Sequence, residues 1–335
     1  MDTHMRIFHW GWTQLLMLLM ATLPWTGAAQ ASDAAQVQGG GTKADRPRIA
    51  LVLSGGGAKG AAHIGVLKVL EEKRIPVDIV VGTSMGSYVA GMYAMGLSAE
   101  EVERMTLAID WNKGYQDKVG RDELSLRKKQ QSEKYQLRTD IGVNGDQTQL
   151  PDGFFQGQSM ASLLRHATSN LPAQKSFDDL PIPYRAMATD METVTPFVLD
   201  SGSLAKAMQA SMSIPGALKP VEWEGHILAD GGTVNNMPVD VAKAMGADVV
   251  IAVDIGAKLR TRESLKSGLA MIDQLTTYMT QVGTEKQKAL LGPKDVLLSP
   301  EFGNMGIADF ALMPEGIKQG EAVANRASAQ LDALS

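Results

Sequence analysis

Short apolar runs alternate with helical periodicity through the first part of the chain. Two runs of strand length, Ile49–Leu53 and Val77–Val81, are followed by helical patterns over Ala58–Glu72 and Ser84–Met95. Such alternation is typical of parallel strands joined by crossover helices, and strands that are apolar at nearly every position are buried on both faces. The pattern therefore predicts an α/β fold with a mainly parallel central sheet.

A second passage repeats this alternation further along the chain. Strand-like runs at Pro183–Ala188, His226–Ala229 and Asp248–Val253 are separated by helical patterns near Leu204–Ser211 and Val239–Met245. Helices that cross over between parallel strands cover both faces of the sheet. We therefore predict three layers, α/β/α.

Two longer stretches depart from the alternation. Residues 110–151 are polar, contain the basic cluster Arg127–Lys129, and include a predicted hairpin over residues 135–150 that turns at Asn144-Gly145. We interpret residues 110–151 as an excursion over the sheet within a domain formed by residues 48–256. Residues 257–335 are predicted to be a mainly helical extension packed on that domain.

The N-terminal residues 1–31 have the pattern of a cleaved export signal. A short apolar run, Leu15–Leu23, precedes the small residues of Ala29-Gln30-Ala31. The run ends at Pro24 and is shorter than the roughly 20 apolar residues that span a bilayer. Residues 32–47 are rich in Ala, Gly and Gln and predict a flexible leader. We therefore expect an exported protein that is periplasmic, associated with the outer membrane, or secreted.

The amino-acid composition excludes several kinds of catalytic and binding site. The 335 residues include no cysteine, which excludes a cysteine nucleophile, disulfide scaffolds, thiolate zinc sites and iron–sulfur clusters. The chain has 32 Lys and Arg against 37 Asp and Glu, which gives a net charge of −5. This mildly acidic balance, with charges scattered along the chain, argues against a nucleic-acid partner. We expect neither a metal nor an organic cofactor.

The strongest local signal is Gly82-Thr83-Ser84-Met85-Gly86, a G-x-S-x-G sequence between a predicted strand and a predicted helix. A serine at such a sharp turn projects from the end of the sheet, and a side chain at Gly82 or Gly86 would collide with the neighbouring strand and helix. The dipole of the helix adds positive potential at the hydroxyl. Ser84 is therefore the candidate nucleophile.

A glycine-rich loop follows the first strand. Gly55-Gly56-Gly57-Ala58-Lys59-Gly60 contains G-x-G-x-x-G, but the second strand does not end in the acid that a dinucleotide site requires. A Walker loop is also excluded, because Gly60 stands where Ser or Thr would follow Lys59. Bare amides at a helix N-terminus can instead hold developing negative charge, as an oxyanion hole does.

The nucleophile needs a base, and two arrangements are open. His226 could act with Asp190 or Asp200 in a Ser-Asp-His order, whereas His63 and His166 have the patterns of packing and surface residues. The better candidate is Asp230 in Asp230-Gly231-Gly232, at the C-terminal end of a predicted strand. A carboxylate in a dry pocket with no competing cation becomes more basic, so a Ser-Asp dyad is chemically sufficient.

The three motifs, in this order, resemble the patatin-like phospholipases. Further similar blocks are His63–Leu67, Ala188–Asp190, Ala210–Gly216 and Asn236–Val239. The resemblance implies a patatin-like fold in which residues 48–256 are the catalytic domain. It implies Ser84 as nucleophile, Asp230 as base, and the amides of Gly55, Gly56 and Gly57 as oxyanion hole. Gly60, Gly82, Gly86, Gly231 and Gly232 are then motif glycines, and Lys59, where the family often has Arg, is a possible headgroup contact.

The resemblance also implies an activity: hydrolysis of the carboxylic esters of phospholipids or lysophospholipids through an acyl-enzyme, at a peripheral membrane surface. Two alternatives remain open. One is a Ser-His-Asp esterase that uses His226 on soluble esters. The other is a catalytically silent lipid-binding effector on the same fold, because a fold does not guarantee an activity.

Overall fold

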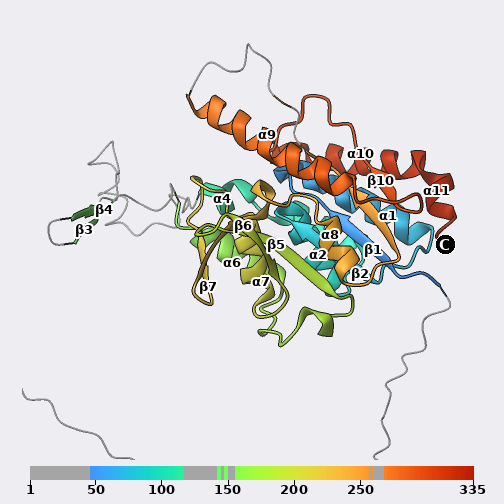
Figure 1. The fold of residues 1–335 in the computed structure, drawn as a ribbon, viewed down its shortest axis with the longest axis horizontal. Coiled ribbons are helices and arrows are strands. Elements are labelled where there is room, and N and C mark those ends of the chain that lie inside the picture. Colours follow the sequence, from blue (N-terminus) through green and yellow to red (C-terminus); the bar gives the residue numbers. More distant parts are fainter. Residues whose placement is uncertain (1–45, 117–141, 145–146, 150–154, 257–258, 260–267) are drawn as a thin grey trace, which may run out of the picture. The chain divides into compact units, whose positions relative to one another are not determined.

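The computed structural model describes residues 46–116, 142–144, 147–149, 155–256, 259 and 268–335 (Figure 1). The predicted signal peptide, nearly all of the leader and the basic cluster Arg127–Lys129 lie outside the described residues. The described residues form one compact unit. Within the described part of the chain, no helix has both the length and the apolar character needed to cross a bilayer.

An eight-stranded sheet forms the centre of this unit, in the order β10-β9-β1-β2-β5-β8-β7, with β6 paired to β5. Pairing is parallel from β10 to β5 and antiparallel at β6, β8 and β7, which confirms the predicted mainly parallel sheet. The strands are β1 Ile49–Leu53, β2 Ile79–Thr83, β5 Tyr184–Asp190, β6 Thr195–Leu199, β7 Val221–Trp223, β8 His226–Asp230, β9 Val249–Val253 and β10 Val296–Leu298.

Helices cover both faces of the sheet, as the three-layer prediction required. Leu51 of β1 points into a large apolar cluster with α1, α2, α7 and α10, whereas its neighbour Val52 packs on the opposite side with α8. The α-helices are α1 Ala61–Glu72, α2 Met85–Ala94, α3 Ala99–Ala108, α4 Trp111–Gln116, α6 Gln158–Ala167, α7 Leu204–Met212, α8 Val239–Ala244, α9 Gly268–Lys288, α10 Met313–Arg326 and α11 Ser328–Asp332. Short 3-10 turns are η1 Gly57–Gly60, η3 Phe177–Asp179, η4 Gly231–Thr233 and η6 Phe310–Leu312.

The C-terminal extension is built into this fold. Helix α10 lies against α1, where a Cβ on Gly320 would overlap the backbone of Ala62. Strand β10 adds the edge of the sheet, with Val296 in register with Ile251 of β9. The prediction of a mainly helical extension therefore missed one strand, because only three residues pair and Leu297 between them is exposed.

The predicted hairpin in the polar excursion is seen in part. Strands β3 Gly142–Asn144 and β4 Gln147–Gln149 pair in antiparallel register, with Asn144 opposite Gln147. The rest of the predicted hairpin lies outside the described residues.

Candidate active site

Ser84 sits on a strained turn between β2 and α2. Its φ of 53° is a conformation that residues with a side chain rarely adopt, and its side chain is nearly buried. The Ser84 N–H donates to Oγ of Ser211 at 2.8 Å, and Oγ of Ser87 donates to the Ser84 carbonyl at 2.7 Å. These bonds hold the turn that sends the hydroxyl out from the end of the sheet.

The two glycines of the G-x-S-x-G sequence are required because neighbouring backbone atoms lie too close to leave room for a Cβ. A Cβ on Gly82 would overlap the backbone of Gly86, and a Cβ on Gly86 would overlap the carbonyl of Leu53 in β1. The tight packing expected from the sequence is therefore present. It brings the start of α2 against the end of β1, next to the glycine loop.

Asp230 ends β8 opposite Ala188 of β5 and is 8% exposed. Its N–H donates to the Ser213 carbonyl at 2.8 Å, and its Oδ1 accepts from the Gly232 N–H at 2.7 Å. Burial raises the pKa of Asp230 to about 6, against hydrogen bonds from the Ser84 side chain and the Gly232 N–H that lower it. The Ser84 side chain is therefore close enough to Asp230 to act on its pKa, and the carboxylate is more basic than an exposed one.

The glycine loop lines the same cavity as Ser84 and Asp230. Gly55 donates its N–H to Oδ1 of Asn236 at 3.1 Å, and the Asn236 side chain donates back to the Gly55 carbonyl at 3.3 Å. Neither the Gly56 nor the Gly57 N–H has an acceptor among the residues that the structure describes. Gly57 also has a φ of 58°, and a Cβ there would overlap the carbonyl of Ile307. Of the three predicted amides, the one on Gly55 is thus already engaged within the protein.

A cavity of about 340 Å³ joins these groups. Its inner wall is formed by Ser84, Asp230, the three glycines of the loop and Asn236. Its outer wall comes from α4, α9 and two loops, through Asn112, Tyr115, Ile214, Pro215, Thr277, Thr280, Ile307, Ala308 and Phe310. Asp230 is the one charged side chain among the lining residues described, so nothing cationic neutralises it there.

Lys59 is not part of this cavity. Its side chain is 8% exposed, and its Nζ lies 5.4 Å from the centre of the Phe302 ring. The ammonium group is therefore turned into the protein, and the predicted headgroup contact at Lys59 is not supported by the structure.

His226 is paired with an acid, but away from Ser84. Its Nδ1 donates to Oδ2 of Asp190 at 2.8 Å, and this bond holds the pKa of Asp190 below its ordinary value. His226 begins β8 and Asp230 ends it, so about 13 Å of extended strand separates them. The Asp190–His226 pair that the triad alternative requires thus exists, but His226 does not line the cavity of Ser84.

The other two histidines of the folded part have no place in the cavity either. His63 is fully buried, burial lowers its pKa to about 4, and its Nε2 lies 2.8 Å from the Ser54 carbonyl. His166 is exposed on α6. Among the described residues there is also no group of three or more His, Asp or Glu side chains arranged to hold a metal ion.

Sequence reasoning missed several residues of the site. Asn236 and Ser211 stand in blocks that carry the family resemblance, but only the structure shows that they hold the glycine loop and the serine turn. Tyr115 and Phe310 had no signal, because one lies in a polar stretch and the other in the C-terminal extension. Their 195-residue separation is closed only by the fold, which stacks the rings 5.6 Å apart.

The match to a family model shows which protein family the chain belongs to. The model of the patatin-like phospholipases matches residues 51–243, more than half of the chain. The chain belongs to this family. The matched range of the patatin-like protein includes the glycine loop, Ser84 and Asp230, that is, the whole inner wall of the cavity.

Curated relatives match nearly two thirds of this patatin-like protein. Patatin-like phospholipase domain-containing protein 6 of Mus musculus is 37% identical over 215 residues, which are 64% of this chain and 14% of that protein. Lysophospholipase NTE1 of Mycosarcoma maydis is 34% identical over 209 residues, 62% of this chain and 10% of that protein. The chain thus spans a small part of the curated relatives it matches. VipD from Legionella pneumophila superposes with a TM-score of 0.46 at 15% identity, over 86% of this chain and 67% of VipD.

Proposed function

We propose that this patatin-like protein is a serine lipid acyl hydrolase of the phospholipase A or lysophospholipase type. The observation that carries the proposal is that Ser84 and a buried Asp230 line one cavity, which has no cationic lining residue among those described. The family relationship supports it, as does the printed activity of one relative, a lysophospholipase.

In the proposed acylation step, Oγ of Ser84 attacks the ester carbonyl carbon while Asp230 takes the hydroxyl proton. The carbonyl oxygen becomes an oxyanion, to which the free N–H groups of Gly56 and Gly57 donate. When the tetrahedral intermediate collapses, the bond to the alcohol oxygen breaks and Asp230 returns the proton to it. The alcohol leaves and the acyl group stays on Ser84.

Deacylation uses the same groups in the same roles. Asp230 takes a proton from water as the water oxygen attacks the acyl carbon, and the glycine amides again hold the oxyanion. Collapse releases the fatty acid and returns the proton to Oγ of Ser84. A carboxylate with a pKa near 6 suits this cycle, because it is ionised at neutral pH and still basic enough to accept a proton.

The chemistry of the cavity favours the acyl part of the substrate inside and the headgroup outside. Its outer wall carries no charged side chain and includes the apolar Ile214, Pro215, Ile307 and Phe310. An anionic phosphate would meet no cationic side chain there and would face the charge of Asp230. The volume of about 340 Å³ lies at the lower end of the range for ligand pockets, about 300–1,000 Å³, and suits one acyl chain.

The alternative triad requires His226 to reach Ser84, and the length of β8 between His226 and Asp230 speaks against it. The silent effector requires a site that has lost part of its chemistry. The candidate nucleophile Ser84, the candidate base Asp230 and the two glycine N–H groups without a described acceptor speak against such a loss. Hydrolysis through the Ser84–Asp230 dyad is therefore the better proposal.

Product analysis tests the activity directly. Purified protein is incubated with a phosphatidylcholine that carries two different acyl chains and with its lysophosphatidylcholine, and the released fatty acids are identified by mass spectrometry. We expect fatty acid from at least one of them with the wild type and none above background with Ser84→Ala. Equal release by the variant would overturn the proposed function.

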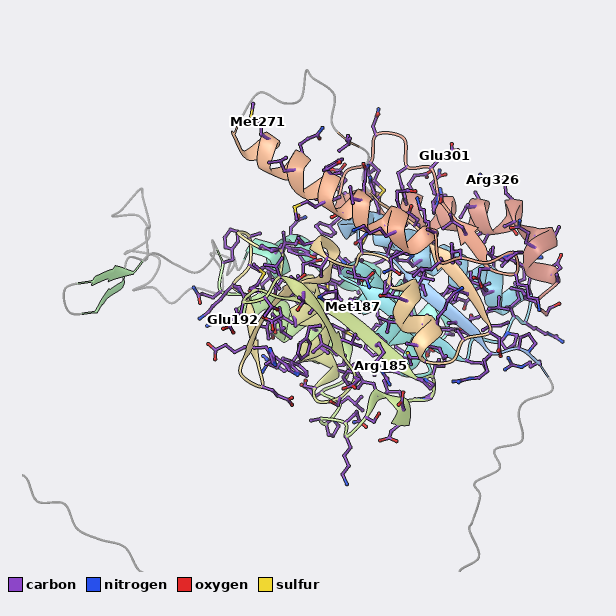
Figure 2. The ribbon with its side chains drawn as sticks, viewed as in Figure 1. Arg185, Met187, Glu192, Met271, Glu301 and Arg326 are labelled. Carbon is purple, nitrogen blue, oxygen red and sulfur yellow. The ribbon has the colours of Figure 1, made fainter. Side chains whose placement is uncertain are left out.

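We also propose that the protein works at a membrane surface, as its substrate requires. Helix α9 supports this, because its Thr277 and Thr280 face the cavity while a stripe of apolar side chains on the opposite side is exposed. The stripe follows helical spacing: Met271, Leu275, Tyr278, Met279 and Val282. In Figure 2, Met271 stands at the tip of this helix, at the edge of the folded body. An apolar helix face beside a lipid cavity can enter the headgroup region of a bilayer.

Vesicle co-sedimentation tests the membrane contact. The double variant Leu275→Gln/Met279→Gln should lower binding to phosphatidylcholine vesicles at least ten-fold, because each buried aliphatic side chain contributes about 1.5–3 kcal/mol. Val194→Gln, which changes an exposed valine of the β5–β6 turn, is the matched control. Equal binding of wild type and double variant would exclude α9 as the contact.

Two earlier expectations stay as parts of this proposal. We propose that Arg127–Lys129 add attraction to anionic headgroups, which triple Gln substitution and vesicles with and without anionic lipid would test. We also propose export, with a mature chain that begins at Ser32. Cell fractionation and the N-terminal mass of the purified protein would test it, and a full-length cytosolic product would contradict it.

A further inference from the structure

His63 is a fully buried polar side chain next to the glycine loop, outside the cavity lining. It lies in the first turn of α1, and its Nε2 is 2.8 Å from the carbonyl oxygen of Ser54, the residue before Gly55. A carbonyl oxygen only accepts hydrogen bonds, so Nε2 carries the proton. Burial lowers the pKa of His63 to about 4, so the ring is neutral at pH 7 and Nδ1 carries no proton.

Packing alone does not require a histidine at this position. The Nδ1 atom is buried, and no described group of the protein makes a hydrogen bond with it. A buried polar atom without a partner is unfavourable, and an apolar side chain of similar volume would fill the same space without one. What the imidazole adds to packing is therefore its Nε2–H, which donates to the Ser54 carbonyl.

The peptide group between Ser54 and Gly55 is held at both of its polar atoms. Its carbonyl oxygen accepts from His63. Its N–H donates to Oδ1 of Asn236 at 3.1 Å and to the Asn236 carbonyl at 3.3 Å. The carbonyl and the N–H of a trans peptide point in opposite directions, so His63 and Asn236 hold this group from opposite sides.

The next peptide group carries one of the two amides without a described acceptor. Its carbonyl, on Gly55, accepts from Nδ2 of Asn236 at 3.3 Å, and its N–H is that of Gly56. Gly55 has no side chain to limit rotation between the two peptide groups. The direction of the Gly56 N–H therefore depends on both groups being held in place.

Helix α1 gives His63 a rigid support. A Cβ on Gly65 would overlap the carbonyl of Ile317 in α10, and a Cβ on Gly320 of α10 would overlap the carbonyl of Ala62. The two helices thus pack backbone against backbone on either side of His63. A donor carried by such a helix holds its acceptor within narrow limits.

We propose that His63 is a positioning residue of the oxyanion hole, which together with Asn236 fixes the peptide groups on both sides of Gly55 and so the direction of the Gly56 N–H. This inference rests on the proposed ester hydrolysis at Ser84. A donor that is aimed in advance stabilises the oxyanion without reorganisation. Loss of His63 should therefore lower kcat with little change in KM, because the oxyanion forms only after the substrate has bound.

A matched pair of inhibitors separates this role from a general effect on stability. One is a long-chain alkyl trifluoromethyl ketone, and the other is the corresponding methyl ketone. Oγ of Ser84 adds to the electron-poor carbonyl carbon of the first, its proton passes to Asp230, and the carbonyl oxygen becomes an oxyanion. The methyl ketone binds with little addition, so the ratio of the two inhibition constants reports on the oxyanion hole. Partial unfolding weakens both inhibitors equally and leaves the ratio unchanged.

The variants change the donor of His63 at similar side-chain volume. His63→Leu removes it and should lower both kcat and the inhibitor ratio at least about ten-fold, with KM changed less than about two-fold. If His63→Leu does not fold, His63→Met takes its place, because its flexible side chain adapts to the site and also lacks a donor. His63→Gln provides an N–H of similar reach and should return the ratio to within about three-fold of the wild type.

Thr168→Val is the matched control. It removes a buried hydroxyl that donates to the Leu164 carbonyl at 2.9 Å, away from the cavity lining, and should keep the wild-type ratio. The inference is overturned if the ratio stays at the wild-type value in His63→Leu, if it is equally low in His63→Gln, or if Thr168→Val lowers it as much. Failure of the proposed function is a different result, in which the wild type binds both ketones alike and releases no fatty acid from either phospholipid.

Discussion

The inner and outer walls of the cavity are built in different ways. The inner wall holds Ser84 and Asp230 through backbone hydrogen bonds to the sheet and its turns, such as the 2.8 Å bond from the Asp230 N–H. It lies wholly within the range that matches the family, residues 51–243. Much of the outer wall, including Thr277, Thr280 and Phe310, lies beyond that range. Under the proposed function, we expect the inner wall to carry the reaction and the outer wall to influence the choice of substrate.

Hydrogen bonds join the two walls. Oγ1 of Thr280 donates to the Gly232 carbonyl at 3.0 Å, directly beside Asp230. The Ile307 carbonyl accepts from the Ala58 N–H at 2.8 Å, at the end of the glycine loop. We therefore expect changes in the inner wall to abolish turnover, and changes in the outer wall to alter affinity and selectivity.

The largest effect is expected at the nucleophile. Ser84→Ala should lower kcat by at least about a thousand-fold, because no other group can form the acyl-enzyme. Circular dichroism and thermal unfolding should show a folded protein, since the substitution removes only the hydroxyl oxygen. A variant that is folded and retains more than a tenth of the activity would contradict the assignment of Ser84.

Removal of the base should come next. Asp230→Asn should lower kcat/KM by about a hundred-fold or more, the size of a general-base effect. His226→Ala should change it less than about three-fold, because His226 lies at the far end of β8. A hundred-fold loss in the histidine variant would instead favour the triad alternative.

The pH dependence should report the same carboxylate. Because Asp230 must be ionised to accept a proton and its pKa is about 6, log kcat/KM should rise with unit slope to about pH 6 and then level off. The folded-state pKa is above the unfolded one, so this group makes the protein less stable as pH rises through the window between them. Asp230→Asn should therefore raise Tm relative to the wild type above pH 6, and a lower Tm there would contradict the burial argument.

The smallest effect is expected at the junction of the walls. Thr280→Val keeps the shape of the side chain but removes its hydrogen bond to the Gly232 carbonyl. We expect KM to rise about two- to five-fold with little change in kcat, since one neutral hydrogen bond of about 1 kcal/mol is lost outside the reacting groups. A fall in kcat with constant KM would show that α9 positions Asp230 and would weaken the separation of the two walls.

The inner wall could be predicted because its signals are local. Ser84 is marked by glycines two residues before and after it, and these are required by contacts with adjacent turns. Strand β1 begins and ends at the predicted residues, since an uninterrupted apolar run of five residues is typical of a strand buried on both faces. The hydrogen bond between Gly55 and Asn236 could not be predicted from the sequence, because it joins residues 181 positions apart.

The outer wall could not be predicted for the same reason. Nothing near Tyr115 in the sequence indicates that Phe310 will stack on it, and the contact exists only when the extension folds back over α1 and α4. Lys59 is the opposite case. The family resemblance implied a possible headgroup contact there, but its Nζ lies 5.4 Å from the centre of the Phe302 ring, far along the chain.

The central claim is that Ser84 is activated by Asp230 without a histidine. A fluorophosphonate that forms a covalent bond with active serines tests this most directly, by peptide mapping and by the rate of labelling at pH 8. The account predicts an adduct on Ser84 alone, formed about a hundred-fold more slowly in Asp230→Asn and at an unchanged rate in His226→Ala. An adduct on another serine, or a labelling rate that depends on His226 and not on Asp230, would contradict it.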